Sequence, residues 1–196
     1  ATHQILEDIG MMKMLPGMTV INPCDYNQTK LATIALGDHI GPAYLRFGRP
    51  KWPIFTPENT KFQIGKGIKF LDGNDISIFA TGHMLWQALE AEKMLFSLGF
   101  SCEVINIHTI KPIDEEIILE SIKKTKCAIS CEEHNIIGGL GESISRLISE
   151  KYPIPFKVIG VNDSFGESGK PLDLLEKYNL NPESIKEAAL EVIDQK

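Results

Sequence analysis

The stretch DISIFATGHMLWQALEAEKML at residues 75–95 decides the fold. Its apolar run at 76–80 is typical of a strand that is buried on both faces. Thr81-Gly82-His83 then forms a tight turn, and apolar residues recur at helical spacing at Leu85, Ala88, Leu89, Leu95 and Phe96. Gly99 is suited to end this helix, because glycine tolerates the left-handed backbone of a helix cap. A strand, a turn and a helix in direct succession predict one unit of a parallel α/β sheet.

Downstream, the same unit repeats. The strands that we expect are CEVINI at 102–107, CAISCEE at 127–133 and FKVIGV at 156–161, after a twisted strand in FQIGKGIKFLDG at 62–73. Between them we expect a helix over 113–123, and another from the glycines of GGLGES at 138–143 to about residue 150. Two helical patterns end the chain, and Asn181-Pro182 is a cap and first turn for the second of them. This order predicts a mostly parallel sheet with helices on both faces.

Upstream, the chain holds too few strands for a complete domain. A helix over 4–15 ends at Pro16-Gly17, a strand follows in MTVINP at 18–23, and Asp25 caps a helix that runs to about Leu36. The segment AYLRFGRP at 43–50 is a second strand. Two parallel strands cannot close a core, because each expects neighbours on both sides. We therefore interpret this part as the end of a domain whose earlier strands are absent.

Prolines mark the boundary between these two parts. The stretch RPKWPIFTPENTKF at 49–62 contains Pro50, Pro53 and Pro57 and indicates an extended, semi-rigid linker. We place a boundary near residues 50–62, which divides the chain into a first domain remnant, 1–55, and a second domain, 56–196. The second domain has enough strands and helices to fold alone, and the first does not.

The composition excludes some classes of partner. The 196 residues carry a net charge of −6, with basic residues scattered among acidic ones, so we expect no nucleic acid and no membrane as a partner. The four cysteines lack the second close pair that a zinc site needs. We interpret them as buried, reduced thiols, which fits a cytoplasmic location.

Two residues stand where parallel α/β sheets gather ligand groups. His3 precedes a helix, where an imidazole could donate a hydrogen bond to a substrate or shuttle a proton, or simply cap the helix. Arg49 follows a strand between Gly48 and Pro50, and its guanidinium could clamp a phosphate or form a surface salt bridge. Arg46, three residues earlier, is expected on the opposite side of the strand.

Other polar residues favour structural roles. Gly138, Gly139 and Gly141 could present backbone amides to an anion, but without dinucleotide-binding spacing they favour close packing of a helix on the sheet. Residues 132–134, two glutamates and a histidine, could form an acid/base group, but we interpret them as strand-end charges next to solvent, which is the simpler explanation. His83 is interpreted as structural. The residues alone thus lead to an incomplete α/β domain, a complete one, and a phosphate site at Arg49.

The order of motifs resembles the transketolase family. In that family a Thr-His-Gln motif precedes an acidic helix, as in residues 1–25, and GPAYLRFGRP at 41–50 resembles the end of the pyrimidine-binding domain. Residues 75–95, 106–118 and 132–143 resemble the C-terminal domain. The stretch DSFGESGKPLDLLEKYNL at 163–180 is most similar to the C-terminal subunit of split transketolases. The resemblance implies the C-terminal part of a pyrimidine-binding domain, followed by a three-layer α/β transketolase C-terminal domain.

The resemblance also implies a function. His3 matches the family histidine that contacts the donor sugar, and Arg49 matches the arginine that binds the sugar phosphate. The intact enzyme would use thiamine diphosphate and Mg²⁺ to transfer a two-carbon ketol unit between sugar phosphates in the pentose phosphate pathway, as a homodimer. The residues that bind the cofactor and the metal belong to the family's N-terminal portion, on the same chain or a separate subunit. We therefore expect this chain to be a fragment that is inactive alone.

Other functions stay open. The chain could be a fragment of 1-deoxy-D-xylulose-5-phosphate synthase or of a 2-oxoacid dehydrogenase beta subunit, which share both domains. Alternatively, the second domain could be a non-catalytic α/β module for nucleotide binding, interaction or dimerisation.

Overall fold

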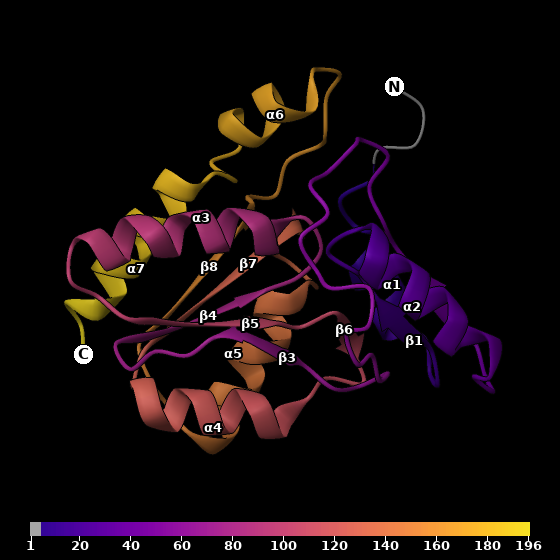
Figure 1. Ribbon diagram of the computed structural model, residues 1–196, viewed down its shortest axis with the longest axis horizontal. Coiled ribbons are helices and arrows are strands. Elements are labelled where there is room, and N and C mark those ends of the chain that lie inside the picture. The colour runs from indigo at the N-terminus through magenta and orange to yellow at the C-terminus, as the bar shows by residue number, and fades with distance from the viewer. Residues whose placement is uncertain (1–4) are drawn as a thin grey trace.

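A five-stranded sheet forms the centre of the computed structural model, which describes residues 5–196 (Figure 1). Its strand order is β3-β5-β4-β7-β8. The strands β4 (Ile76–Ala80), β5 (Cys102–Asn106), β7 (Ala128–Asn135) and β8 (Phe156–Val161) are mutually parallel, and β3 (Ile68–Leu71) runs antiparallel to β5. The mostly parallel sheet expected from the sequence is therefore confirmed.

Helices cover both faces of this sheet, as predicted. The helices α3 (Met84–Ser97) and α7 (Pro182–Ile193) lie on one face, and α4 (Glu115–Thr125) and α5 (Leu140–Lys151) lie on the other (Figure 1). The short helix α6 (Pro171–Lys177) lies at the periphery (Figure 1).

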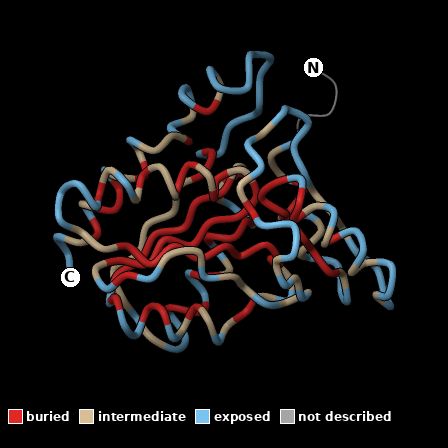
Figure 2. Tube along the Cα trace, in the orientation of Figure 1, coloured by how far each residue is buried: buried red, intermediate tan, exposed pale blue. Residues whose placement is uncertain are grey.

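Strand β4 shows why its sequence is apolar throughout. Ile76, Ile78 and Ala80 belong to the core under α3 and α7, whereas Phe79 belongs to the core on the opposite face. Because successive side chains point to opposite faces, a strand covered on both sides needs apolar residues at nearly every position. All five residues of β4 are buried, and the sheet is the largest buried region in Figure 2.

Local signals place the helix ends. Asn181 and Asp25 accept hydrogen bonds from the backbone N–H groups of Ser184 and Gln28, at the starts of α7 and α2. Gly99 has a φ of +93° just after α3 and donates its N–H to the Phe96 carbonyl. These predicted caps are all confirmed.

The first part of the chain forms a smaller unit. It comprises α1 (Asp8–Met14), β1 (Thr19–Ile21), α2 (Tyr26–Gly37) and β2 (Ala43–Leu45), and β1 pairs with β2 in parallel. The predicted alternation of helix and strand is confirmed. Figure 1 shows this unit in indigo beside one end of the larger sheet.

A strand that the sequence did not predict joins the two parts. It is β6 (Thr109–Lys111), which pairs antiparallel with β1 and gives a three-stranded sheet of order β2-β1-β6. The residues of β6 come from the second predicted domain, so this sheet crosses the predicted boundary. A three-residue strand before Pro112 carries little periodicity, and its partner lies about ninety residues away in the sequence.

The proline-rich segment is extended but packed. Trp52 and Phe55 contact the larger hydrophobic core, and Thr56 is buried. The division into domains 1–55 and 56–196 stays a prediction, and extensive contacts connect the two parts.

Candidate functional site

Arg49 lies in the loop that follows β2, where the sequence placed it. We call residues 46–52 the Arg49 loop. Arg49 is exposed, and within residues 5–196 its guanidinium forms no hydrogen bond and no ion pair. A cation that is accessible and has no protein partner can bind an anionic ligand with several donors. The other predicted site residue, His3, lies outside the described residues.

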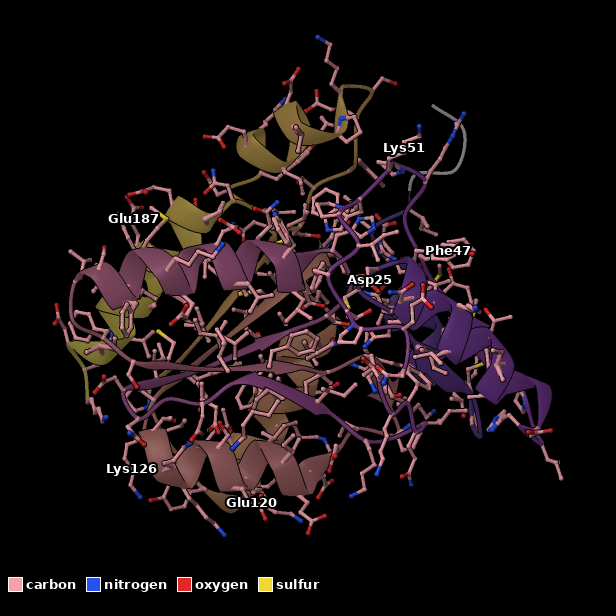
Figure 3. The ribbon with its side chains drawn as sticks, viewed as in Figure 1. Asp25, Phe47, Lys51, Glu120, Lys126 and Glu187 are labelled. Atoms are coloured by element: carbon pink, nitrogen blue, oxygen red, sulfur yellow. The ribbon has the colours of Figure 1, made fainter. Side chains whose placement is uncertain are left out.

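Contacts at both ends hold the Arg49 loop in place. At its start, Arg46 is largely buried, and its Nη2 donates to the Glu133 carbonyl at 2.9 Å. At its end, the Trp52 ring stacks on the His83 ring, with 4.5 Å between centroids and 13° between planes. Figure 3 labels Phe47 and Lys51 on this loop, with Asp25 further inside the molecule. The loop has no regular secondary structure, so these contacts set its path.

Asp8 connects the start of the chain to the same loop. The Asp8 side chain is buried, and its Oδ2 accepts from Arg46 Nε at 3.1 Å and from the Tyr44 hydroxyl at 2.8 Å. Burial and the neighbouring carboxylate raise the pKa of Tyr44 to about 12, so its hydroxyl remains a donor. Sequence reasoning missed this cluster because Asp8 and Arg46 are 38 positions apart and no local pattern links them.

The glycine-rich turn before α5 binds the side chain of Glu132 through its backbone N–H groups. The Glu132 carboxylate accepts from Leu140 N at 2.7 Å and from Gly141 N at 2.9 Å. A side chain at Gly139 would overlap this carboxylate, and a Cβ at Gly141 would lie 2.5 Å from Val158 Cγ1. The predicted close packing is confirmed, and the backbone amides of the turn are used inside the protein.

The interpretation of residues 132–134 as strand-end charges next to solvent is wrong for two of the three. Glu132 and His134 are fully buried, because α1 and the start of α5 cover the end of the long strand β7. Burial raises the pKa of Glu132 to about 7, although two backbone N–H donors and the charge of Lys13 act to lower it. Burial also lowers the pKa of His134, and its Nε2 accepts from Gly10 N at 3.3 Å.

These buried groups attach the first unit to the second. Lys13 Nζ donates to the carbonyls of Gly138 and Gly139, and Asn135 N donates to the Leu6 carbonyl at 2.8 Å. The Cα atom of Gly138 would lie 3.4 Å from a Cβ at Gly10, so the two backbones approach closely there. The chain from Leu6 to Lys13 is thus fixed against the second unit.

An open groove of about 570 Å³ lies beside this contact. Its walls combine apolar side chains, Met11, Met14 and Ile137, with the carboxylates of Glu7, Glu142 and Asp163. None of the residues that line it belongs to the Arg49 loop, so it is separate from the candidate anion site.

Neither a metal-binding cluster nor a membrane-spanning helix is found in the part of the chain that the structure describes. Within residues 5–196, no group of three or more His, Cys, Asp and Glu residues is placed to hold a metal ion. In the same residues, no helix is long and apolar enough to cross a membrane. All four cysteines are free and buried, as the sequence predicted, and burial raises the pKa of each thiol.

The structure thus combines a mostly parallel three-layer α/β domain with a loop that carries an exposed arginine beside it. A family model described as the transketolase C-terminal domain matches residues 65–185. The chain therefore belongs to the transketolase family.

Similarity to individual proteins extends over the whole chain. The chain is 40% identical to the 6-deoxy-6-sulfo-D-fructose transketolase subunit SqwH of Clostridium sp. (strain MSTE9), over 100% of this chain and 61% of that protein. It is 42% identical to a putative transketolase C-terminal section of Methanocaldococcus jannaschii, over 97% of this chain and 60% of that protein. It is 35% identical to one of the subunits of the apulose-4-phosphate transketolase of Phocaeicola vulgatus, over 98% of this chain and 62% of that protein.

A solved structure agrees with these relatives. A protein described as a split-gene transketolase, inactive β4 tetramer, superposes with a TM-score of 0.96 at 40% identity, over 99% of this chain and 64% of that chain. The chain thus spans about three fifths of the length of the curated relatives named above.

Proposed function

We propose that this chain is the C-terminal part of a transketolase that transfers a two-carbon ketol unit between anionic sugars. The observation that carries the proposal is the similarity over the full chain to C-terminal subunits of split transketolases, at 40% identity and a TM-score of 0.96. It covers the first unit as well as the C-terminal domain, so it includes the Arg49 loop.

Arg49 binds the anionic end of the sugar in this proposal. Its guanidinium offers several N–H donors in a planar fork, which suits a phosphate or a sulfonate. The names of two relatives specify a sulfonated sugar and a sugar phosphate, so the class of substrate fits an arginine at this position. His3 would donate a hydrogen bond to the donor sugar near the reacting carbon and stabilise charge that develops on its oxygens.

The cofactor of the proposed enzyme is thiamine diphosphate with Mg²⁺. When bound, this cofactor supplies the carbon–carbon bond cleavage. The buried carboxylates described above do not fit it, because Asp8 is bonded to Tyr44 and Arg46, and Glu132 to backbone amides. We therefore place the groups that hold the diphosphate and the metal in the rest of the enzyme, on the same polypeptide or on an N-terminal subunit.

The oligomeric state, the cellular location and the pathway of the enzyme are also proposed. We infer a homodimer of complete units in the cytoplasm, which serves the pentose phosphate pathway or a related sugar-phosphate conversion. Four buried, free thiols support a reducing compartment.

The first experiment separates the fragment from the complete enzyme. The purified chain, with thiamine diphosphate, Mg²⁺, xylulose 5-phosphate and ribose 5-phosphate, should form no sedoheptulose 7-phosphate. The same mixture with the complete enzyme should form it. Turnover by the isolated chain, or none by the complete enzyme with any anionic ketose, would contradict the proposal.

A pair of variants tests Arg49. Arg49→Ala in the complete enzyme should raise the KM for ribose 5-phosphate roughly 10- to 100-fold, the loss expected for one or two charge-assisted hydrogen bonds. Lys51→Ala removes an exposed cation from the same loop and should change KM by less than about threefold. Equal effects of the two variants would show that only the general charge of the loop matters.

A second candidate function has support of its own. The chain is 31% identical over 97% of its length to 1-deoxy-D-xylulose-5-phosphate synthase of Caldanaerobacter subterraneus, and spans 31% of that protein. Pyruvate with glyceraldehyde 3-phosphate distinguishes the two. A transketolase should release little carbon dioxide from pyruvate, and the synthase should form deoxyxylulose 5-phosphate.

A further inference from the structure

We propose that His83, on the second unit, is a positioning residue that holds the Arg49 loop in the conformation that binds the anionic end of the substrate. The inference rests on the proposed function for the identity of the ligand. It assigns a role to a residue of the C-terminal domain, where the sequence indicated only a structural histidine.

The imidazole of His83 contacts the loop on both sides of Arg49. Trp52, three residues after Arg49, stacks on the ring at 4.5 Å. Gly48, the residue directly before Arg49, lies so close to the ring that a Cβ there would be 2.9 Å from His83 Nδ1 and 3.0 Å from Nε2. One side chain therefore fixes the backbone that leads into Arg49 and the backbone that leads out of it.

Glu133 holds the imidazole and the start of the loop together. Its Oε2 lies 3.5 Å from His83 Nδ1, and its backbone carbonyl accepts from Arg46 Nη2 at 2.9 Å. Burial alone would raise the pKa of the Glu133 carboxyl, but His83 and Arg46 hold it below its usual value. A charged carboxylate thus orients the ring that the loop packs against.

The burial of His83 favours positioning over direct contact with substrate. The His83 side chain is 12% exposed, whereas Arg49 is exposed and has no protein partner within residues 5–196. Without the ring, Trp52 would keep its contact with the core but lose its stacking partner, and Gly48 would lose its neighbour, so residues 47–51 would be held only at Arg46 and at Trp52. A longer free loop must lose more conformational entropy when it binds a ligand, which weakens binding.

Three variants test this role, first in the chain itself and then in the complete enzyme. His83→Ala removes the ring and its polar contact with Glu133. His83→Phe removes the same polar contact but keeps a ring against Trp52 and Gly48. His39→Ala is the matched control, because it removes an imidazole beyond the end of α2, outside the loop. Circular dichroism and thermal melting verify that each variant is folded.

Loop order is measured first, without any substrate. This measurement uses the chain by itself, in which a Trp86→Phe background leaves Trp52 as the single tryptophan, because the chain has two. In that background, His83→Ala should increase acrylamide quenching of Trp52 at least about twofold, and His83→Phe and His39→Ala should not. Unchanged quenching in His83→Ala would overturn the inference.

Ligand binding is measured second, by calorimetry with ribose 5-phosphate and with ribose, and separately from turnover. His83→Ala should weaken binding of the phosphorylated sugar about tenfold and should not affect ribose, and His83→Phe should recover most of the loss. Equal affinity of wild type and His83→Ala for ribose 5-phosphate would overturn the inference. Absence of turnover in the wild type refutes the proposed function alone, because the binding comparison still decides the role of His83.

Discussion

Asp25 offers the sharpest test of how the first unit is attached to the segment that follows it. The Asp25 side chain is buried, and its two oxygens accept four hydrogen bonds. The donors are Gln28 N at 2.9 Å, Phe55 N at 2.9 Å, Thr56 N at 2.7 Å and Thr56 Oγ1 at 2.7 Å. One bond caps α2, and the other three bind the proline-rich segment.

The expected cost of Asp25→Ala follows from these bonds. Loss of a helix cap costs about 1 kcal/mol. Three more donors lose a charged acceptor, at roughly 1–3 kcal/mol each when they stay buried, and these losses are not additive. We expect the free energy of unfolding to fall by about 4 kcal/mol, which lowers the melting temperature by roughly 10 °C for a chain of this size.

Asn181→Ala is the matched control. Asn181 also caps a helix through one backbone N–H, that of Ser184 at 2.8 Å, and its second bond, to Glu176, is exposed. Its loss should cost about 1 kcal/mol. Urea denaturation, followed by circular dichroism and by Trp52 fluorescence in a Trp86→Phe background, measures both variants.

The comparison between the two variants decides the question. If Asp25→Ala costs no more than Asn181→Ala, then the three bonds to the proline-rich segment contribute nothing, and the argument for a fixed attachment fails. A Trp52 transition well before the loss of helicity would show that the segment detaches while the second unit stays folded.

Three further predictions concern the interior of the protein. Burial raises the pKa of Glu132 to about 7, so between about pH 4.5 and 7 the folded protein keeps a proton that the unfolded chain releases, and the free energy of unfolding should fall by about 3 kcal/mol as pH rises. Glu132→Gln should flatten this slope in thermal melts across that range, and an unchanged slope would contradict the assignment. Gly141→Ala should destabilise the protein by about 2 kcal/mol in urea, because its Cβ would lie 2.5 Å from Val158 Cγ1, whereas Gly37→Ala meets no atom within 4 Å and should be nearly neutral. The four thiols should react with Ellman's reagent at pH 7.5 only after denaturant is added, since all are buried with raised pKa values, and rapid labelling of native protein would contradict that.

Part of the candidate site was predictable from sequence. The glycine and proline beside Arg49, at the end of a strand, indicated a guanidinium that is held at an exposed turn, and Arg49 is exposed there in the structure. The contacts that hold the loop were not predictable, because Asp8, His83 and Glu133 come from three other segments. For Glu132 and His134, the sequence pattern indicated solvent, and the packing of α1 and α5 over the end of β7 buried them.

The sequence by itself determined the features that depend on neighbouring residues. Apolar runs and helical spacing specified the parallel sheet and its helices, and the caps at Asp25 and Asn181 specified where helices begin. Tertiary structure alone decided which distant segments meet: the pairing of β6 with β1, and the contact of His83 with both sides of Arg49. The physical reason is that propensities and caps act within one turn of chain, whereas a short strand or a buried charge is stable only beside a partner that folding brings to it.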